Sequence, residues 1–114
     1  MEIRLISSYD EINDTFAGKV DGERGYIADY GISDGIYLGI NNLNLPTSVI
    51  VSHASKSLNT SKDVLESANV KIGIDCDEVC LSFTMIIEDL KIISVKCRNT
   101  FGIPSLNYLM DSNI

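Results

Sequence analysis

The residues best suited to chemistry lie in the segment Ser52-His53-Ala54-Ser55-Lys56. His53 is the only histidine in the 114-residue chain, and a serine lies on either side of it. A nucleophilic serine needs a base within hydrogen-bonding distance, and that base needs an acid to orient it. The segment therefore has two interpretations: a reactive centre with His53 as the base, or the end of a strand that leads into a helical turn.

The spacing of these residues favours the strand end. Residues 48–53 read as a strand, and adjacent side chains on a strand point to opposite faces, so Ser52 and His53 cannot pair there. Ser55 reaches His53 only if the chain turns at Ala54. The Gly-x-Ser-x-Gly turn that presents the nucleophile in many hydrolases is absent around Ser52 and Ser55, because no glycine lies between Gly39 and Gly73.

A small hydrolase-like enzyme nevertheless stays open as the alternative function. It would use His53 as the base, with Ser55 nearby and a carboxylate from Asp34 or Asp10 as its partner. These aspartates are candidates because they lie near the ends of expected strands. Nothing in the sequence brings them together.

The cysteines offer a second possible centre, for a metal or for thiol chemistry. Cys76 and Cys80 are spaced as Cys-x3-Cys, which is not the spacing of a structural zinc knuckle, and no second pair exists. A site built from both cysteines with His53 and Asp75 would need a chance tertiary arrangement. We expect a solvated acidic turn at residues 75–78, a core position for Cys97, and neither metal nor cofactor.

Composition limits the class of protein. The chain is 45% hydrophobic and 22% charged, with a net charge of −7, which fits one globular domain with a core of its own. Basic residues are not clustered, so nucleic acid and anionic membrane surfaces are disfavoured as partners. The acidic N-terminal residues do not resemble a signal peptide, and we expect a cytoplasmic protein.

The hydrophobic pattern predicts the elements that must position these residues. Alternating segments between turn residues indicate about seven short strands, among them residues 1–7, 26–30, 36–40, 48–53 and 79–87. The connections are short, so the pairing should be mainly antiparallel. Asp21-Gly22 and Asp34-Gly35 are typical hairpin turns.

Two short helices are expected. Thr60 or Ser61 can cap a helix of about two turns that begins near Asp63. A second helix is predicted after Pro104, because Leu106, Leu109 and Met110 follow at helical spacing. The predicted fold is α+β: a mainly antiparallel β-sheet of about seven short strands with two short helices.

The whole of residues 1–114 is expected to form a single domain. A weak internal sequence similarity relates residues 34–40 to residues 77–83, and residues 47–51 to residues 93–97. Either the domain holds two similar β-rich halves, residues 1–58 and 59–114, or unrelated hairpins resemble one another by chance.

The first half also carries a family-like pattern. Tyr9-Asp10, Asp14-Thr15-Phe16, Ser33-Asp34-Gly35-Ile36 and Ala54-Ser55-Lys56 occur in this order. Over residues 9–58 the chain resembles a small bacterial family of uncharacterised domains with a Tyr-Asp-x3-Asp-Thr-Leu opening and a terminal Ala-Ser-Lys. Phe16 stands where that family has leucine. The resemblance implies a bacterial origin and a structural role for Asp10 and Asp14, but no activity.

Taken together, these patterns favour a non-enzymatic binding or self-assembly module. A catalytic set is missing, and the edge strands of an open sheet must be covered. Pairing with a second copy or with another protein would cover such an edge, so a homo-oligomer or a protein partner is expected.

Overall fold

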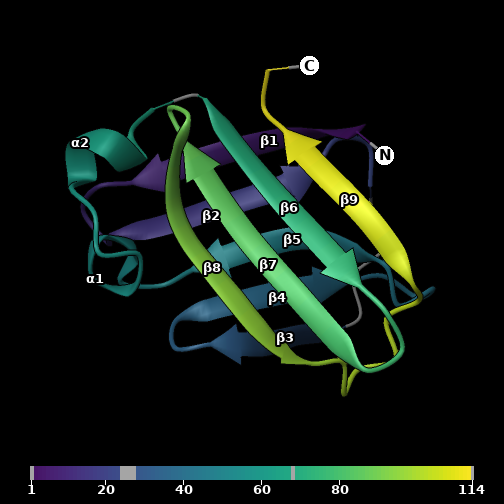
Figure 1. The fold of residues 1–114 in the computed structure, drawn as a ribbon. Helices are drawn as coiled ribbons and strands as arrows, with labels where there is room; N and C mark the ends of the chain where they lie inside the picture. The colour runs from purple at the N-terminus through teal and green to yellow at the C-terminus, as the bar shows by residue number, and fades with distance from the viewer. Residues whose placement is uncertain (1, 24–27, 68, 114) are drawn as a thin grey trace.

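The computed structural model describes residues 2–23, 28–67 and 69–113. Over these residues the chain forms nine strands and two one-turn helices (Figure 1). The strands are β1 (Glu2–Asp10), β2 (Thr15–Val20), β3 (Ala28–Ser33), β4 (Ile36–Ile40), β5 (Pro46–Val51), β6 (Val70–Cys76), β7 (Cys80–Ile87), β8 (Leu90–Arg98) and β9 (Leu106–Asp111). The helices are α1 (Ala54–Ser57) and α2 (Lys62–Leu65).

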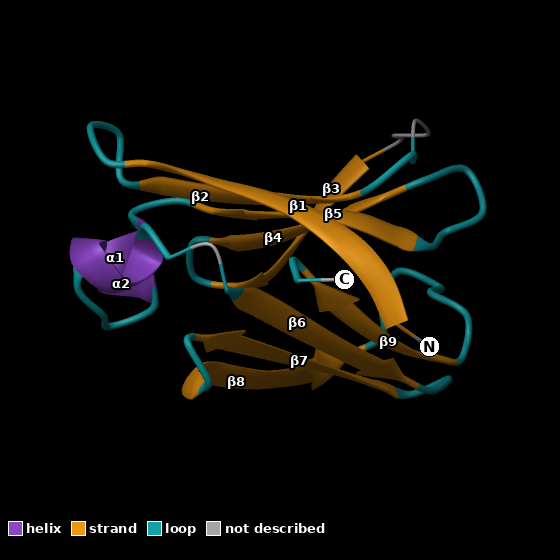
Figure 2. Cartoon of the chain, turned by 90° about the horizontal axis from the view of Figure 1, so that it is seen from above, coloured by secondary structure: helices purple, strands orange, loops and turns teal. Residues whose placement is uncertain are grey.

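All nine strands belong to one folded sheet with the order β3-β4-β5-β2-β1-β9-β6-β7-β8. Figure 2 shows the sheet bent into two layers, with β1 to β5 above and β6 to β9 below, and both helices at one end. The two outermost strands, β3 and β8, contact each other, so the sheet is nearly closed. Beside this seam the rings of Tyr30 and Phe101 stack with centroids 3.6 Å apart.

One parallel pair joins the two layers. β1 pairs with β9 from Glu2 to Arg4, while the other ladders among the described strands are antiparallel. From Leu5 onward β1 pairs with β2 alone and belongs to the upper layer. The sheet therefore splits along β1.

The core lies between the two layers. Strand β7 alternates strictly, and Leu81, Phe83, Met85 and Ile87 are fully buried. Side chains from both halves of the sequence join them in one cluster, including Leu5 and other residues of the upper layer. Period-two alternation with one buried face is the pattern expected of such a two-layer arrangement.

The expected class of fold is confirmed at the level of a mainly antiparallel β protein with two short helices. The number of strands is nine in the described residues rather than about seven. The strand expected at residues 26–30 lies partly outside the described residues, and β3 continues beyond it to Ser33. The strand expected at residues 48–53 ends at Val51.

The prediction of a helix after Pro104 is wrong. Residues Leu106–Asp111 form β9, which pairs with β6 along its whole length and with the start of β1. Hydrogen bonding to two neighbouring strands outweighs the helical spacing of Leu106, Leu109 and Met110.

The helix expected near residue 60 is confirmed in its place as α2, but it has one turn rather than about two. The Ser61 side chain caps it by accepting a 3.3 Å hydrogen bond from Val64 N–H. The other helix, α1, begins directly after His53 and is the helical turn that the strand-end interpretation of this segment expected. Within the described part of the chain, neither helix has the length or apolar character needed to cross a membrane.

Candidate functional site

The segment around His53 is organised by Asp14, which closes the β1–β2 turn. Asp14 has φ 51°, and its carbonyl accepts a 2.7 Å hydrogen bond from Ala54 N–H. Its carboxylate accepts hydrogen bonds from the Ser55 hydroxyl at 2.6 Å and from Tyr9 Oη at 2.6 Å. The Ser55 backbone N–H donates to the same carboxylate at 3.1 Å. Asp14 therefore fastens α1 to the hairpin.

These bonds change the acidity of both partners. Hydrogen bonds from Ser55 and then Tyr9 hold the pKa of Asp14 below its ordinary value. Desolvation, followed by the hydrogen bond to Asp14, raises the pKa of Tyr9 to about 12. The Ser55 hydroxyl donates its hydrogen bond to the Asp14 carboxylate and not to a histidine. This hydroxyl therefore has a structural role.

Asp10 has a structural part in the same turn. Its carboxylate accepts hydrogen bonds from Ile12 N–H at 3.0 Å and from the Asn13 side-chain amide at 2.7 Å. Bonds from Asn13 and Ile12 lower the pKa of Asp10. The geometry of Asp10 and Asp14 agrees with the structural role that the family resemblance implied for them.

His53 stands apart from these carboxylates. It is exposed, has φ 49°, and precedes α1 without capping it through its side chain. Asp34 lies in the exposed turn between β3 and β4, and no hydrogen bond or ion pair joins it to His53 among the described residues. The contacts thus bring Ser55 to Asp14, and they assemble no set of Ser55, His53 and Asp34.

The three cysteines are free thiols. Cys76 on β6 and Cys97 on β8 are both paired with Leu81, so one strand of the sheet separates them. Burial raises the pKa of each of these two thiols. Over residues 2–23, 28–67 and 69–113, no group of three or more His, Cys, Asp or Glu side chains is placed to hold a metal ion.

The acidic turn after β6 is organised by its own backbone. Asp77 accepts hydrogen bonds at 2.7 Å from both Val79 N–H and Cys80 N–H. These bonds lower the pKa of Asp77. Asp77 therefore stabilises the β6–β7 hairpin, as expected of a solvated turn.

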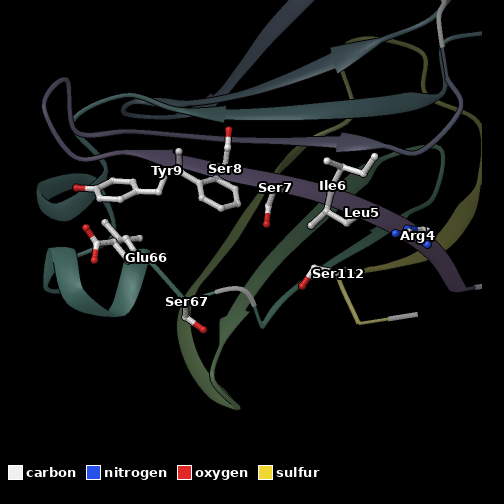
Figure 3. Close-up of a pocket in the computed structure, with 11 residues that line it drawn as sticks. Arg4, Leu5, Ile6, Ser7, Ser8, Tyr9, Glu66, Ser67 and Ser112 are labelled. Atoms are coloured by element: carbon white, nitrogen blue, oxygen red, sulfur yellow. The ribbon is translucent and has the colours of Figure 1, made fainter.

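A cavity lies where β1 leaves β9. The cavity has a volume of about 320 Å³ and lies beside the second half of β1 (Figure 3). The buried side chains of Leu5, Phe16 and Leu65 form its apolar part. Its lining is completed by Arg4, Ser7, Tyr9, Glu66, Ser67 and Ser112, and by β1 at Ile6 and Ser8, whose side chains point away from the cavity in Figure 3.

The backbone of β1 presents hydrogen-bonding groups to this cavity. Asp21 N–H donates to Arg4 C=O, so the even-numbered residues of β1 direct their peptide groups toward β2. The odd-numbered residues Ser7 and Tyr9 direct theirs the other way. On that side no strand of the described chain pairs with β1 beyond Arg4, so this part of β1 is a free edge.

Helix α2 closes one end of the cavity. Lys62 Nζ donates a 3.1 Å hydrogen bond to Glu11 C=O at the tip of the β1–β2 hairpin. Glu66 lines the cavity. A hydrogen bond with Glu11 and the repulsion between the two carboxylates raise the pKa of Glu66. The position of α2 therefore depends on the same hairpin that Asp14 organises.

Sequence reasoning did not find this cavity. Its lining carries no motif, and its walls come from segments far apart in the chain. One signal was available: Ser7 occupies an inward position of β1 between Leu5 and Tyr9, where the alternation calls for an apolar residue. A polar inward residue marks a place where the core is not filled.

No family model, curated protein or solved structure matches this chain. The resemblance of residues 9–58 to a bacterial family of uncharacterised domains stays a prediction.

Proposed function

We propose that this protein is a non-enzymatic binding module that takes up an extended peptide segment along the free edge of β1. The observation that carries the proposal is the early end of the β1–β9 ladder at Arg4, next to a cavity of about 320 Å³. A peptide strand placed there would continue the upper layer of the sheet and cover its edge.

The chemistry of the edge fits a peptide main chain. The N–H and C=O groups of Ser7 and Tyr9 face the cavity and are spaced for pairing with a further strand. A strand along Leu5 to Tyr9 would span roughly 16 Å. Main-chain hydrogen bonds supply affinity in this mode of recognition, and pockets for alternate side chains supply specificity.

The interior of the cavity suits one modest side chain. Leu5 and Leu65 supply apolar contacts, and the hydroxyl of Ser7 points from β1 into the gap in Figure 3. The volume lies at the lower end of the range of about 300–1,000 Å³ found for ligand pockets. A small apolar or hydroxyl-bearing residue of the peptide is the expected occupant.

Selection from a displayed library of random peptides against the immobilised full chain tests the proposal. Selected peptides are then titrated by fluorescence polarisation against wild type, Ser7→Phe and Ser8→Phe. Ser7→Phe places a ring in the cavity and should abolish binding. Ser8→Phe lies on the same strand but faces outward, and binding should persist.

A third variant addresses the backbone. Ser7→Pro removes an N–H that faces the cavity and leaves the β1–β2 ladder intact, so affinity should fall about three- to tenfold. Circular dichroism verifies the fold of each variant. Failure of any peptide to be enriched, or equal loss of binding in Ser7→Phe and Ser8→Phe, would contradict the proposal.

A further inference from the structure

The outer face of the upper layer carries a second feature, independent of the cavity. Side chains that are paired across neighbouring strands share a face of the sheet. Two adjacent rows cross all five strands of this face. In strand order β1-β2-β5-β4-β3, the first row is Ile6, Lys19, Ser48, Gly39 and Asp29, and the second row is Ser8, Ala17, Ile50, Tyr37 and Gly31.

Apolar groups on these rows are open to solvent. Ile6 is 51% exposed, Tyr37 is 40% exposed and Ile50 is 37% exposed. A hollow of about 280 Å³ lies between Ile6 and Ile50, with Ala17 among the residues that line it. Side chains of Ile6 and Ser8 point away from the β1 cavity in Figure 3, so the two features lie on opposite faces.

Part of this face is formed by small residues, among them Gly39 and Gly31. A Cβ built on Gly39 would clash with Ser48 Oγ and lie 3.3 Å from Asp29 Oδ1, so these side chains already extend over the glycine. On the second row the ring of Tyr37 covers Gly31 in the same way. A face of small residues with a few projecting apolar groups is suited to face-to-face packing of two sheets.

The charges on the two rows are arranged symmetrically. Lys19 and Asp29 are their only charged members, at the second and fifth positions of the first row. The midpoint between these positions lies between β5 and β4. On the second row, Ile50 and Tyr37 lie on either side of the same midpoint. The face is thus complementary to itself under a two-fold rotation.

We propose that this face docks onto the same face of a second copy of the chain, about a two-fold axis that runs parallel to the strands between β4 and β5. Lys19 of each copy then lies opposite Asp29 of the other. Tyr37 of the second copy lies against Ile50, beside the hollow. An interface of this kind uses one patch twice, as is usual for two-fold dimers.

The size of the face predicts a weak dimer. The four strands that overlap under this rotation, β2, β5, β4 and β3, are spaced by about 4.8 Å and are about six residues long, which gives a flat footprint of roughly 380 Å². Standard stable interfaces bury about 800 Å² of accessible surface on each partner. We therefore expect monomers and dimers in rapid exchange, with dimers appearing at high micromolar concentration.

Sedimentation velocity on the full chain over a concentration series tests the dimer and its register. Lys19→Asp and Asp29→Lys each place like charges opposite one another, twice per dimer, and should weaken dimerisation about tenfold. The double variant restores opposite charges and should recover the wild-type affinity. Lys91→Asp, on β8 in the other layer, makes the same charge change as Lys19→Asp and should have no effect.

Three results would overturn the proposal. The first is a wild-type chain that stays monomeric throughout the series. The second is a dimer that neither single variant weakens, or whose affinity the double variant fails to recover. The third is a dimer that is lost in Ser7→Phe but kept in Lys19→Asp, because that pattern places self-association at the β1 edge instead.

Discussion

Ser55 donates two hydrogen bonds to the carboxylate of Asp14, one from its hydroxyl and one from its backbone N–H, across 41 residues of sequence. Tyr9 donates a third to the same carboxylate. This junction joins the β1–β2 hairpin to α1, and the end of the β1 cavity is built on that hairpin. Polar residues that resemble a catalytic set therefore hold the site in place.

Replacing Asp14 by Asn should lower the stability of the fold. Asn tolerates the left-handed backbone of this position, so the change removes the charge and one acceptor without adding strain. The urea midpoint should fall below that of wild type. Asp34→Asn is the matched control in another exposed turn, and its midpoint should stay at the wild-type value. Equal midpoints for the two variants would show that the junction contributes nothing.

Acid should weaken the fold through the same carboxylate. The pKa of Asp14 is lowered in the folded protein. Its contribution to the stability of the fold is therefore present above the pKa of about 3.9 of the unfolded chain, and is lost as the pH falls through the pKa of the folded protein. Urea unfolding between pH 7 and pH 2 should therefore show a steeper acid decline in wild type than in Asp14→Asn. Parallel curves for the two proteins would contradict this assignment.

High pH should weaken the fold through ionisation of Tyr9. The pKa of Tyr9 is raised to about 12 in the folded protein. Its contribution to the stability of the fold is therefore complete below the pKa of about 10 that it has in the unfolded chain, and is lost as the pH rises through about 12. In the absorbance titration of the tyrosines, one phenol should ionise near pH 12. Tyr9→Phe should remove that component and leave the others in place. A wild-type titration without a late component would exclude the hydrogen bond.

Gly35 and Gly22 form a matched pair for testing how tightly the β3–β4 turn is packed. Both have positive φ, so alanine should cost about 1–2 kcal/mol at either position. A Cβ on Gly35 would also lie 2.9 Å from Ser52 C=O, whereas nothing lies within 4 Å of one on Gly22. Gly35→Ala should therefore unfold at a lower urea concentration than Gly22→Ala. The reverse order would show that the turn relaxes freely.

The thiols of Cys76, which is buried, and Cys97, which is half-buried, should react slowly in the folded protein. Burial raises the pKa of Cys76 and Cys97, which reduces the thiolate fraction at a given pH. Cys76 is also only 4% exposed. Labelling with a chromogenic disulfide reagent should be slow for both residues and become fast in urea, with Cys76→Ser and Cys97→Ser assigning the phases. Fast labelling of Cys76 in the native state would contradict its placement in the core.

Local patterns were enough to predict most strands. The alternation of residues 36–40 and 79–87 reflects one buried face, and Asp34-Gly35 occupies the turn that its sequence indicates. The Ser61 cap also follows from local chemistry. These features depend on neighbours within a few residues. Hydrophobic periodicity and turn preferences carry information over the same short range of sequence.

Features that depend on distant partners could not be predicted. Leu106, Leu109 and Met110 suit a helix or a strand, and pairing with β6 and β1 decides for the strand. The turn at His53 is fixed by Asp14, which no local pattern connects to it. The β1 cavity exists because β9 stops pairing at Asp111, and that register is a property of the whole sheet.

The parallel β1–β9 pair also has a consequence for folding kinetics. It brings Glu2 beside Leu109, whereas β1–β2, β3–β4, β4–β5, β6–β7 and β7–β8 are hairpins of short span. Contacts between residues so distant in sequence carry the largest loop-closure entropy and slow the folding of β proteins. We therefore expect the hairpins of each layer to form first, and the joining of β9 to β1 to limit the rate at which the sheet becomes continuous.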